Sequence, residues 1–389
     1  MLFELYGDTC ITQLLGWVLV FAGLVLMNEI GRRTKAGGIL VFVIIPLALT
    51  VYFIVANAAA AAGAPWAVNN PTVVYMGGWF HYAKLYAADI GCVGFMMIKY
   101  KWGIGKQDWF KVWPWLIVSI NILIAVASDL ESFFKGIAAG GLQGGWWYSV
   151  EGVWLYGGWW NLVNAIAGVI NCLCMTGCWS VFSSKDQKDM VWADMTVWFI
   201  VAYDIWNFEY TYLNLPTHTW YCGVALLLAP TFANAFWNKG GWIQNRANTL
   251  AIWCMFAQVF PLFQISEKFS VLPSVYGKEA QGLAAIDLTT LYAPGANSIA
   301  ENVEAVAAMS GADRAALLQT VGVVADPTMQ GVVALAALVA NVLCITVIIK
   351  RAMAKPAGQR NPYKYDVFVG TRDYEEARAR VEDGAKFPA

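Results

Sequence analysis

The stretch GILVFVIIPLALTVYFIVANAA at residues 38–59 decides the fold class, because its 22 residues include no Lys, Arg, Asp or Glu. A helix of about 20 mainly apolar residues crosses the roughly 30 Å of hydrocarbon in a bilayer. The whole chain has a matching composition, with 59% hydrophobic and 13% charged residues, whereas about a quarter of the residues in soluble domains are charged. The sequence therefore predicts an all-α fold, a polytopic bundle of membrane helices.

Eight further segments have a similar length and apolarity. Residues 1–265 are expected to form a bundle of eight spans, and a last transmembrane helix follows at residues 329–349. No Lys or Arg precedes the first apolar run, so we expect a retained anchor and not a cleaved signal peptide. The nine predicted transmembrane helices are 11–29, 38–59, 79–98, 112–130, 159–181, 191–212, 219–237, 247–265 and 329–349.

Basic residues are distributed unevenly between the two sides of this predicted bundle. Of the 25 Lys and Arg residues, 20 fall in loops and a tail on one side, four fall on the other side, and Lys84 lies within a span. Because loops rich in Lys and Arg stay in the cytoplasm, the pattern predicts an outer N-terminus and an inner C-terminus. We expect a multi-pass protein of a bacterial cytoplasmic membrane.

An outer loop at residues 132–158 combines many glycines with many aromatic residues. We expect this loop to be too flexible for a stable helix, yet too aromatic to remain free in water. It is predicted to pack over the outer rim of the bundle and to shield three tryptophans, Trp146, Trp147 and Trp154.

Two polar segments lie outside the predicted spans. Residues 266–328 form a long outer loop with helices expected at 299–309 and 312–321, which predicts a small extracytoplasmic helical cap. Residues 350–389 form a cytoplasmic tail, and its charged run RDYEEARARVED is typical of a solvated helix.

Ionisable residues within the spans are the first candidates for a functional site, because a charge in hydrocarbon costs about 2.5–3.5 kcal/mol even on an insertion scale. The third span carries His81, Lys84 and Asp89, and the sixth carries Asp204 and Glu209. At 1.5 Å per residue, Lys84 and Asp204 lie at similar depths in the outer half of the membrane. We therefore predict a charge pair between Lys84 and Asp204, with snorkelling of the lysine to the headgroups as the alternative.

Amide side chains add a second polar layer at similar depth. Asn121 and Asn164 are candidates for a binding site or charge relay, together with the ionisable residues of the third and sixth spans. The alternative is that these amides only bridge helices, which stabilises a bundle modestly.

Several kinds of chemistry are disfavoured. His81 and His218 both lie at outer ends of spans and would hold at most one haem, so neither haem nor quinone is predicted as a cofactor. The eight cysteines are scattered through apolar segments, which argues against a disulfide framework or a metal site. Basic runs are short, so nucleic acid is not a predicted partner.

Five stretches of the chain are similar to an uncharacterised bacterial family of multi-spanning membrane proteins that carries a domain-of-unknown-function label. The resemblance extends over residues 75–260 and brings no activity with it, while the long outer loop and the tail look like additions. It implies that Lys84, Asn121, Asp129, Glu131, Asn161 and Asn164 lie in characteristic stretches of the family. The five stretches are WFHYAKLYA (79–87), SINILIAVASDLE (119–131), GGWWNLVNAIAGVIN (157–171), YCGVALLLAPT (221–231) and WIQNRANTLAIWCMF (242–256).

These observations favour a transporter-like protein that binds a small solute or ion between the third and eighth spans, with Asp89, Asp204 and Lys84 as its charged groups. Two alternatives stay open. One is a membrane-anchor subunit of a redox or other multiprotein complex, and the other is a structural or sensory membrane protein. The expected partners are the lipid bilayer, a small solute or ion, and a second copy or complex partner held through the cap or the tail.

Overall fold

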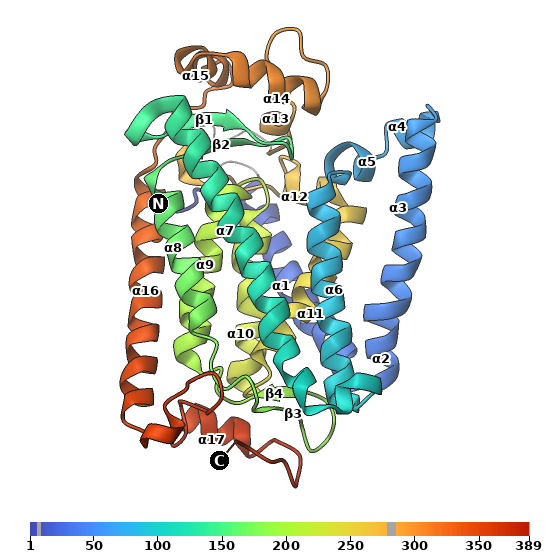
Figure 1. The fold of residues 1–389 in the computed structure, drawn as a ribbon. Coiled ribbons are helices and arrows are strands. Elements are labelled where there is room, and N and C mark those ends of the chain that lie inside the picture. Colours follow the sequence, from blue (N-terminus) through green and yellow to red (C-terminus); the bar gives the residue numbers. More distant parts are fainter. Residues whose placement is uncertain (6–8, 278–284, 389) are drawn as a thin grey trace.

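The computed structural model describes residues 1–5, 9–277 and 285–388, in which long helices stand side by side in a bundle (Figure 1). Strands in these residues are confined to two short antiparallel hairpins, β1 (Gly145–Tyr148) with β2 (Trp154–Gly157), and β3 (Val181–Ser183) with β4 (Met190–Trp192). The predicted all-α fold is thus confirmed.

Each of the nine predicted segments is helical over most of its length. Four helices differ from the predicted bounds by five residues or more: α7 ends ten residues late, α8 ends eight residues early, α9 starts six residues late, and α11 starts five residues early. The corresponding helices are α1 (Cys10–Arg33), α2 (Lys35–Ile39) leading through a π-helical turn into α3 (Ile45–Ala61), α6 (Trp79–Tyr100), α7 (Trp113–Gly140), α8 (Trp159–Leu173), α9 (Val197–Asn214), α10 (Leu226–Phe236) after a π-helical turn, α11 (Trp242–Val259) followed by α12 (Pro261–Ile265), and α16 (Thr328–Met353).

Four helical stretches in the described chain are long and apolar enough to cross a membrane: Cys10–Arg33, Lys35–Ala61, Asp108–Gln143 and Thr328–Met353. Their apolar side chains also face outward, as shown by Leu19, Ile54 and Val339, which are 61%, 65% and 56% exposed. Soluble proteins rarely expose such extended apolar surface. The outward faces of these helices are therefore suited to contact with lipid.

The segment 132–158 differs from the prediction in its first part and agrees with it in the second. Helix α7 continues to Gly140, so residues 132–140 are helical in spite of their glycines, whereas β1 and β2 form a hairpin that packs on α7. A Cβ atom on Gly136 would lie 2.1 Å from the carbonyl oxygen of Gly157. Glycine at residue 136 thus permits close approach of the hairpin and does not loosen the helix. The prediction that three tryptophans are shielded is confirmed, since Trp146, Trp147 and Trp154 are 6%, 7% and 0% exposed.

Three short helices lie over the hairpin at one end of the bundle, drawn in orange in Figure 1, and we call this end the cap face. They are α13 (Ala285–Thr289), α14 (Ile299–Ala308) and α15 (Gly311–Gln319), and the last two confirm the predicted helices. Ser298 and Ser310 cap their N-termini by accepting backbone hydrogen bonds. The hairpin holds the cap through Tyr148, whose hydroxyl donates to the carbonyl of Thr289 at 2.8 Å.

The opposite end of the bundle, which we call the tail face, carries the hairpin β3–β4 and the C-terminal segment (Figure 1). The predicted solvated helix is only seven residues long, α17 (Arg372–Arg378), and one side of it is buried, because Tyr374 and Ala377 are each 1% exposed. The buried carboxylate of Asp194 accepts the backbone N–H groups of Val367 and Phe368 at 2.9 and 2.8 Å. The predicted helix in this charged run is thus present, but it is docked through one buried side and is not solvated all round.

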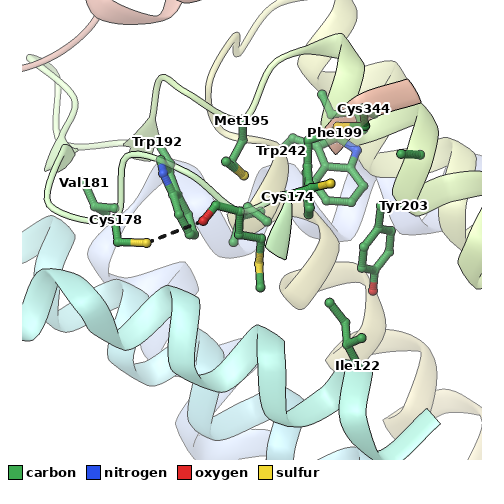
Figure 2. Close-up of a cluster of buried hydrophobic side chains, with 14 of the residues drawn as sticks. Ile122, Cys174, Cys178, Val181, Trp192, Met195, Phe199, Tyr203, Trp242 and Cys344 are labelled. Carbon is green, nitrogen blue, oxygen red and sulfur yellow. Dashed lines mark hydrogen bonds between the residues drawn. The ribbon is translucent and has the colours of Figure 1, made fainter. Parts of the chain in front are cut away.

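A dense hydrophobic core fills the bundle above the tail face (Figure 2). It joins Trp192 of β4, Tyr203 of α9 and Trp242 of α11, and the rings of Tyr203 and Trp242 lie 5.0 Å apart in an edge-to-face contact. Cys178, Cys174 and Cys344 lie among these side chains as free thiols. Because close-packed interiors leave few voids, this core separates the middle of the bundle from the tail face.

Candidate functional site

Three adjoining cavities extend from the cap face toward the middle of the bundle. Their volumes are about 290 Å³ for a vestibule beneath the hairpin, about 110 Å³ for a middle cavity and about 40 Å³ for a small floor cavity. The vestibule and the middle cavity share the lining residues Phe80, His81, Tyr210, Leu215 and His218. The middle and floor cavities share Asn121, Tyr203, Arg246 and Leu250.

The vestibule has an acidic rim around two histidines. Glu151, in the turn between β1 and β2, has its Oε2 atom 3.2 Å from Nδ1 of His81, a contact that becomes an ion pair only when the imidazole is protonated. Burial raises the pKa of Glu151 to about 7, against the opposing effect of a hydrogen bond from the backbone N–H of Phe80. At the neck below, the rings of His81 and His218 lie 6.5 Å apart. The entrance to the middle cavity is thus lined by groups that titrate.

Lys84 is one of the predicted site residues, and it lies in the middle cavity. It is not paired there with Asp204, the predicted partner. Its ammonium group lies 5.2 Å from the ring centres of Phe80 and Tyr210, and it forms no ion pair with any carboxylate in the described part of the chain. Asp204 instead accepts a hydrogen bond from Thr231 of α10 at 2.7 Å. The predicted direct pair of Lys84 and Asp204 is therefore wrong, because Asp204 bonds to α10 and not to α6.

Arg246 is the second cation of the middle cavity, although the predicted spans 219–237 and 247–265 leave it in the loop between them. It lies in the second turn of α11 and is 8% exposed. Its Nη2 atom donates to Oδ1 of Asn207 at 3.0 Å, while Nε and Nη1 are buried without a hydrogen-bond partner. The guanidinium carbon also lies 5.7 Å from the ring centre of Tyr203. The polar run QNRAN concealed the start of the helix, although Gly240 and Gly241 just before it mark a turn.

Two more of the predicted site residues reach these cavities. His81 lines both the vestibule and the middle cavity, and Asn121 lines the middle and floor cavities. The amide nitrogen of Asn121 donates to the carbonyl of Ile117 in its own helix at 2.9 Å. The structure therefore brings together His81, Lys84 and Asn121 from the predicted set.

The other predicted residues lie outside the three cavities. Asp89 is partly exposed, with one buried oxygen that lacks a hydrogen-bond partner. Glu209 is fully buried, and neither of its carboxyl oxygens has a hydrogen-bond partner among the described residues. Asn164 donates to Asp129 at 2.9 Å. These residues do not contribute to the site that contains Lys84.

Asn164 belongs to a fully buried cluster around Asp129, where three amides donate to one carboxylate. Asn164 and Asn214 donate at 2.9 and 2.6 Å, and Asn161 donates more weakly at 3.4 Å. A buried carboxylate needs such donors to replace water. The cluster connects α7, α8 and α9 and has the features of helix bridging.

No group of three or more His, Cys, Asp or Glu side chains in the part of the chain that the structure describes could hold a metal ion.

A search of the curated proteins found no match, and neither did a search of the solved structures. One protein family matches, with the description "Family of unknown function (DUF5692)", and the match covers residues 7–380. It includes the cap and most of the tail, so the expectation that these segments are additions to the family is wrong. The extent of the match, almost the whole chain, shows that this protein belongs to that family of unknown function.

Proposed function

We propose that this protein is an integral membrane protein that binds a small solute or ion in the middle cavity and transports it. The observation that supports the proposal best is the series of three cavities, which leads from the cap face to charged and amide side chains in the interior. Polar groups that converge in a partly apolar cavity are the usual form of a small-molecule site. Ionisable residues inside a membrane bundle are likewise most often functional.

In this proposal the bundle is open toward the cap face. The neck of His81, His218 and Tyr210 would admit a small solute, and the core around Tyr203 and Trp242 would close the path to the tail face. Transport would require this core to separate while the neck closes. Pro230 within α10, and Pro261 between α11 and α12, interrupt helices beside the cavity, and such breaks permit bending.

We further propose that all nine apolar helices span a bacterial cytoplasmic membrane, with the cap face outside. The test uses single added cysteines and a membrane-impermeant thiol reagent on intact cells. Cysteine in place of Ala64 or Ser310 should react, and cysteine in place of Gln187, in the tail-face hairpin, should not. The reverse pattern would place the cap face in the cytoplasm.

The native cysteines test whether the middle cavity is open to water. Cys222 and Cys254 line it, whereas Cys92 and Cys344 are buried outside all three cavities. The full-length protein in lipid nanodiscs is treated with a small methanethiosulfonate, and the modified cysteines are identified by peptide mass spectrometry. We expect Cys222 or Cys254 to react much faster than the two controls. Equal and negligible reaction at all four would contradict a solute site and favour a structural or anchoring role.

A further inference from the structure

We infer that the solute is a small anion with a carboxylate or similar oxyanion group, bound by the guanidinium of Arg246 in the middle cavity. This inference rests on the proposed solute-binding function and specifies the chemical class of the solute.

The guanidinium of Arg246 has hydrogen-bond donors that lack acceptors among the described residues. Arginine is always charged and offers five N–H donors, yet within the described residues the Arg246 side chain donates one hydrogen bond, to the neutral amide of Asn207. Its Nε and Nη1 atoms are buried and have no acceptor in that part of the chain. Since a buried charge is costly unless it is paired and hydrogen-bonded, an oxyanion in the cavity would supply the missing acceptors.

The middle cavity is lined by positively charged side chains. Its lining includes Lys84 and Arg246, and none of the lining residues is acidic. Asp204 lies outside this lining and interacts electrostatically with Arg246, but its hydrogen bond is to Thr231. Glu131 and Glu151 belong to the vestibule, so no carboxylate in the lining of the middle cavity balances its two cations. Because charges act strongly in a medium of low dielectric constant, this field favours an anion over a cation.

Gln264 offers a further side-chain amide to a ligand, and the volume of the middle cavity limits the size of that ligand. Gln264 lines the cavity, is 1% exposed, and has no hydrogen-bond partner at Nε2 or Oε1. Its amide could donate to a second oxygen of the ligand. The volume of about 110 Å³ corresponds to a few water molecules, each about 30 Å³ in the liquid. The cavity therefore suits a compact oxyanion of a few heavy atoms.

Two native thiols report on the potential inside this cavity. Both Cys222 and Cys254 experience the positive charges of Lys84 and Arg246, so their reaction rates with charged reagents depend on the field of those residues. The experiment compares an anionic reagent, 2-sulfonatoethyl methanethiosulfonate, with a cationic one, 2-(trimethylammonium)ethyl methanethiosulfonate. Each rate is divided by the rate with free 2-mercaptoethanol, which removes the intrinsic difference between the reagents.

We expect the normalised rate at Cys254 to favour the anionic reagent by about tenfold or more. Millimolar acetate, sulfate or phosphate should slow the reaction, and choline should not. Protection by acetate alone would indicate a carboxylate, and protection by sulfate or phosphate an inorganic oxyanion. Equal normalised rates, with no protection by any anion, would overturn the inference and leave the proposed solute site intact. If the smaller, neutral methyl methanethiosulfonate also fails to react with Cys222 or Cys254, the proposed function itself fails.

Variants then assign the preference to particular residues. Arg246→Gln should abolish the preference for the anionic reagent, and Arg246→Lys should retain part of it. If Arg246→Gln does not fold, Lys84→Met provides the test and should lower the preference severalfold. The matched control is Lys99→Met, which removes another buried lysine whose ammonium donates to the carbonyls of Arg32 and Lys188. An equal loss of preference in the control would contradict a role for the cavity cations.

Discussion

Two buried arginines at different positions in the bundle have opposite surroundings. Arg32, at the tail face, is 4% exposed and donates to Asp189 at 2.9 Å and to Glu29 at 2.6 Å, and Arg380 donates to the same Asp189. Arg246, in the middle cavity, is 8% exposed and has only the amide of Asn207. The two side chains are equally hidden from water, yet only the first is neutralised by carboxylates.

The difference indicates that the burial of an arginine does not by itself show whether its role is structural or in ligand binding. A buried ion pair with satisfied hydrogen bonds fixes the packing of the elements that it joins, and removal of one partner strands the other. Arg246 makes a single link of this kind, from α11 to Asn207 of α9, and its Nε and Nη1 have no acceptor among the described residues. We therefore interpret the Asp189 cluster as structural and Arg246 as available to a ligand.

The largest effect is expected when the Asp189 cluster is broken. Asp189→Ala would leave the guanidinium groups of Arg32 and Arg380 without their shared carboxylate, and removal of one partner from a buried pair costs about 3–5 kcal/mol. The free energy of unfolding should fall accordingly and most of the protein should be lost as aggregate. Size-exclusion chromatography and thermal unfolding in detergent measure this. Stability close to that of the unmodified protein would show that the cluster is not structural.

Glu151 is a carboxylate buried in the vestibule beside His81 and Glu131. We expect its substitution to have an intermediate effect on stability. Because burial raises its pKa from 4.5 to about 7, the neutral form is favoured in the folded protein. Stability from this group is fully present below about pH 4.5 and is lost as the pH rises to about 7. Allowing for water in the vestibule, Glu151→Gln should increase stability at pH 8 by about 1–2 kcal/mol and leave it unchanged at pH 4.5. The check is unfolding of both proteins across this range; a constant difference at every pH would contradict the prediction.

Arg246→Gln should change stability much less than Asp189→Ala does, by under about 1 kcal/mol in either direction, because the arginine has one neutral partner to lose. The preference of Cys254 for the anionic reagent should nevertheless disappear. Thermal unfolding in the absence of added anions measures the first effect. A loss of several kcal/mol would place Arg246 with the structural cluster.

The smallest effect is expected at a partly exposed ion pair. Lys239 and Asp373 are 2.9 Å apart, with side chains 26% and 25% exposed, and Asp373 also accepts the backbone N–H of Val197. Exposed pairs contribute about 0–1 kcal/mol, so Asp373→Asn should lower stability by less than 1 kcal/mol. High salt should reduce even this difference, as thermal unfolding at low and high salt would show. A larger, salt-independent loss would indicate a specific role in docking the tail.

Much of the fold could be predicted because apolar runs of spanning length leave few alternatives to helices. The ends could not be predicted where a helix is polar at its start or stops while the sequence is still apolar. Gln244, Asn245 and Arg246 precede the predicted eighth span, but α11 already begins at Trp242, because its amides are buried within the bundle. Conversely, α8 ends at Leu173, although the apolar sequence continues into β3.

Only part of the candidate site could be predicted, because a single sequence indicates depth along a helix but not the direction of a side chain. Depth along a helix can be estimated from residue number, and it placed Lys84 and Asp204 at similar heights. The direction in which each side chain points depends on the rotation of the helix, which a single sequence does not fix. Asp204 bonds to Thr231 of α10, and the partner-poor cation beside Lys84 is Arg246 of α11. His81 and Asn121 were identified because they lie on α6 and α7, which line the same cavity as Lys84.

The docked tail has a consequence for the biogenesis of the protein. Val367 and Phe368 fill the acceptors of Asp194, and Arg380 reaches Asp189, so two buried carboxylates of the tail face are completed only by residues that follow α16. Translation proceeds from the N-terminus, and these residues leave the ribosome after every long helix of the bundle. The tail face can therefore be completed only after the rest of the bundle has been synthesised. Until these residues are made, Asp194 keeps the hydroxyl of Thr176 but lacks the two backbone donors of the tail, and Asp189 keeps Arg32 but lacks Arg380.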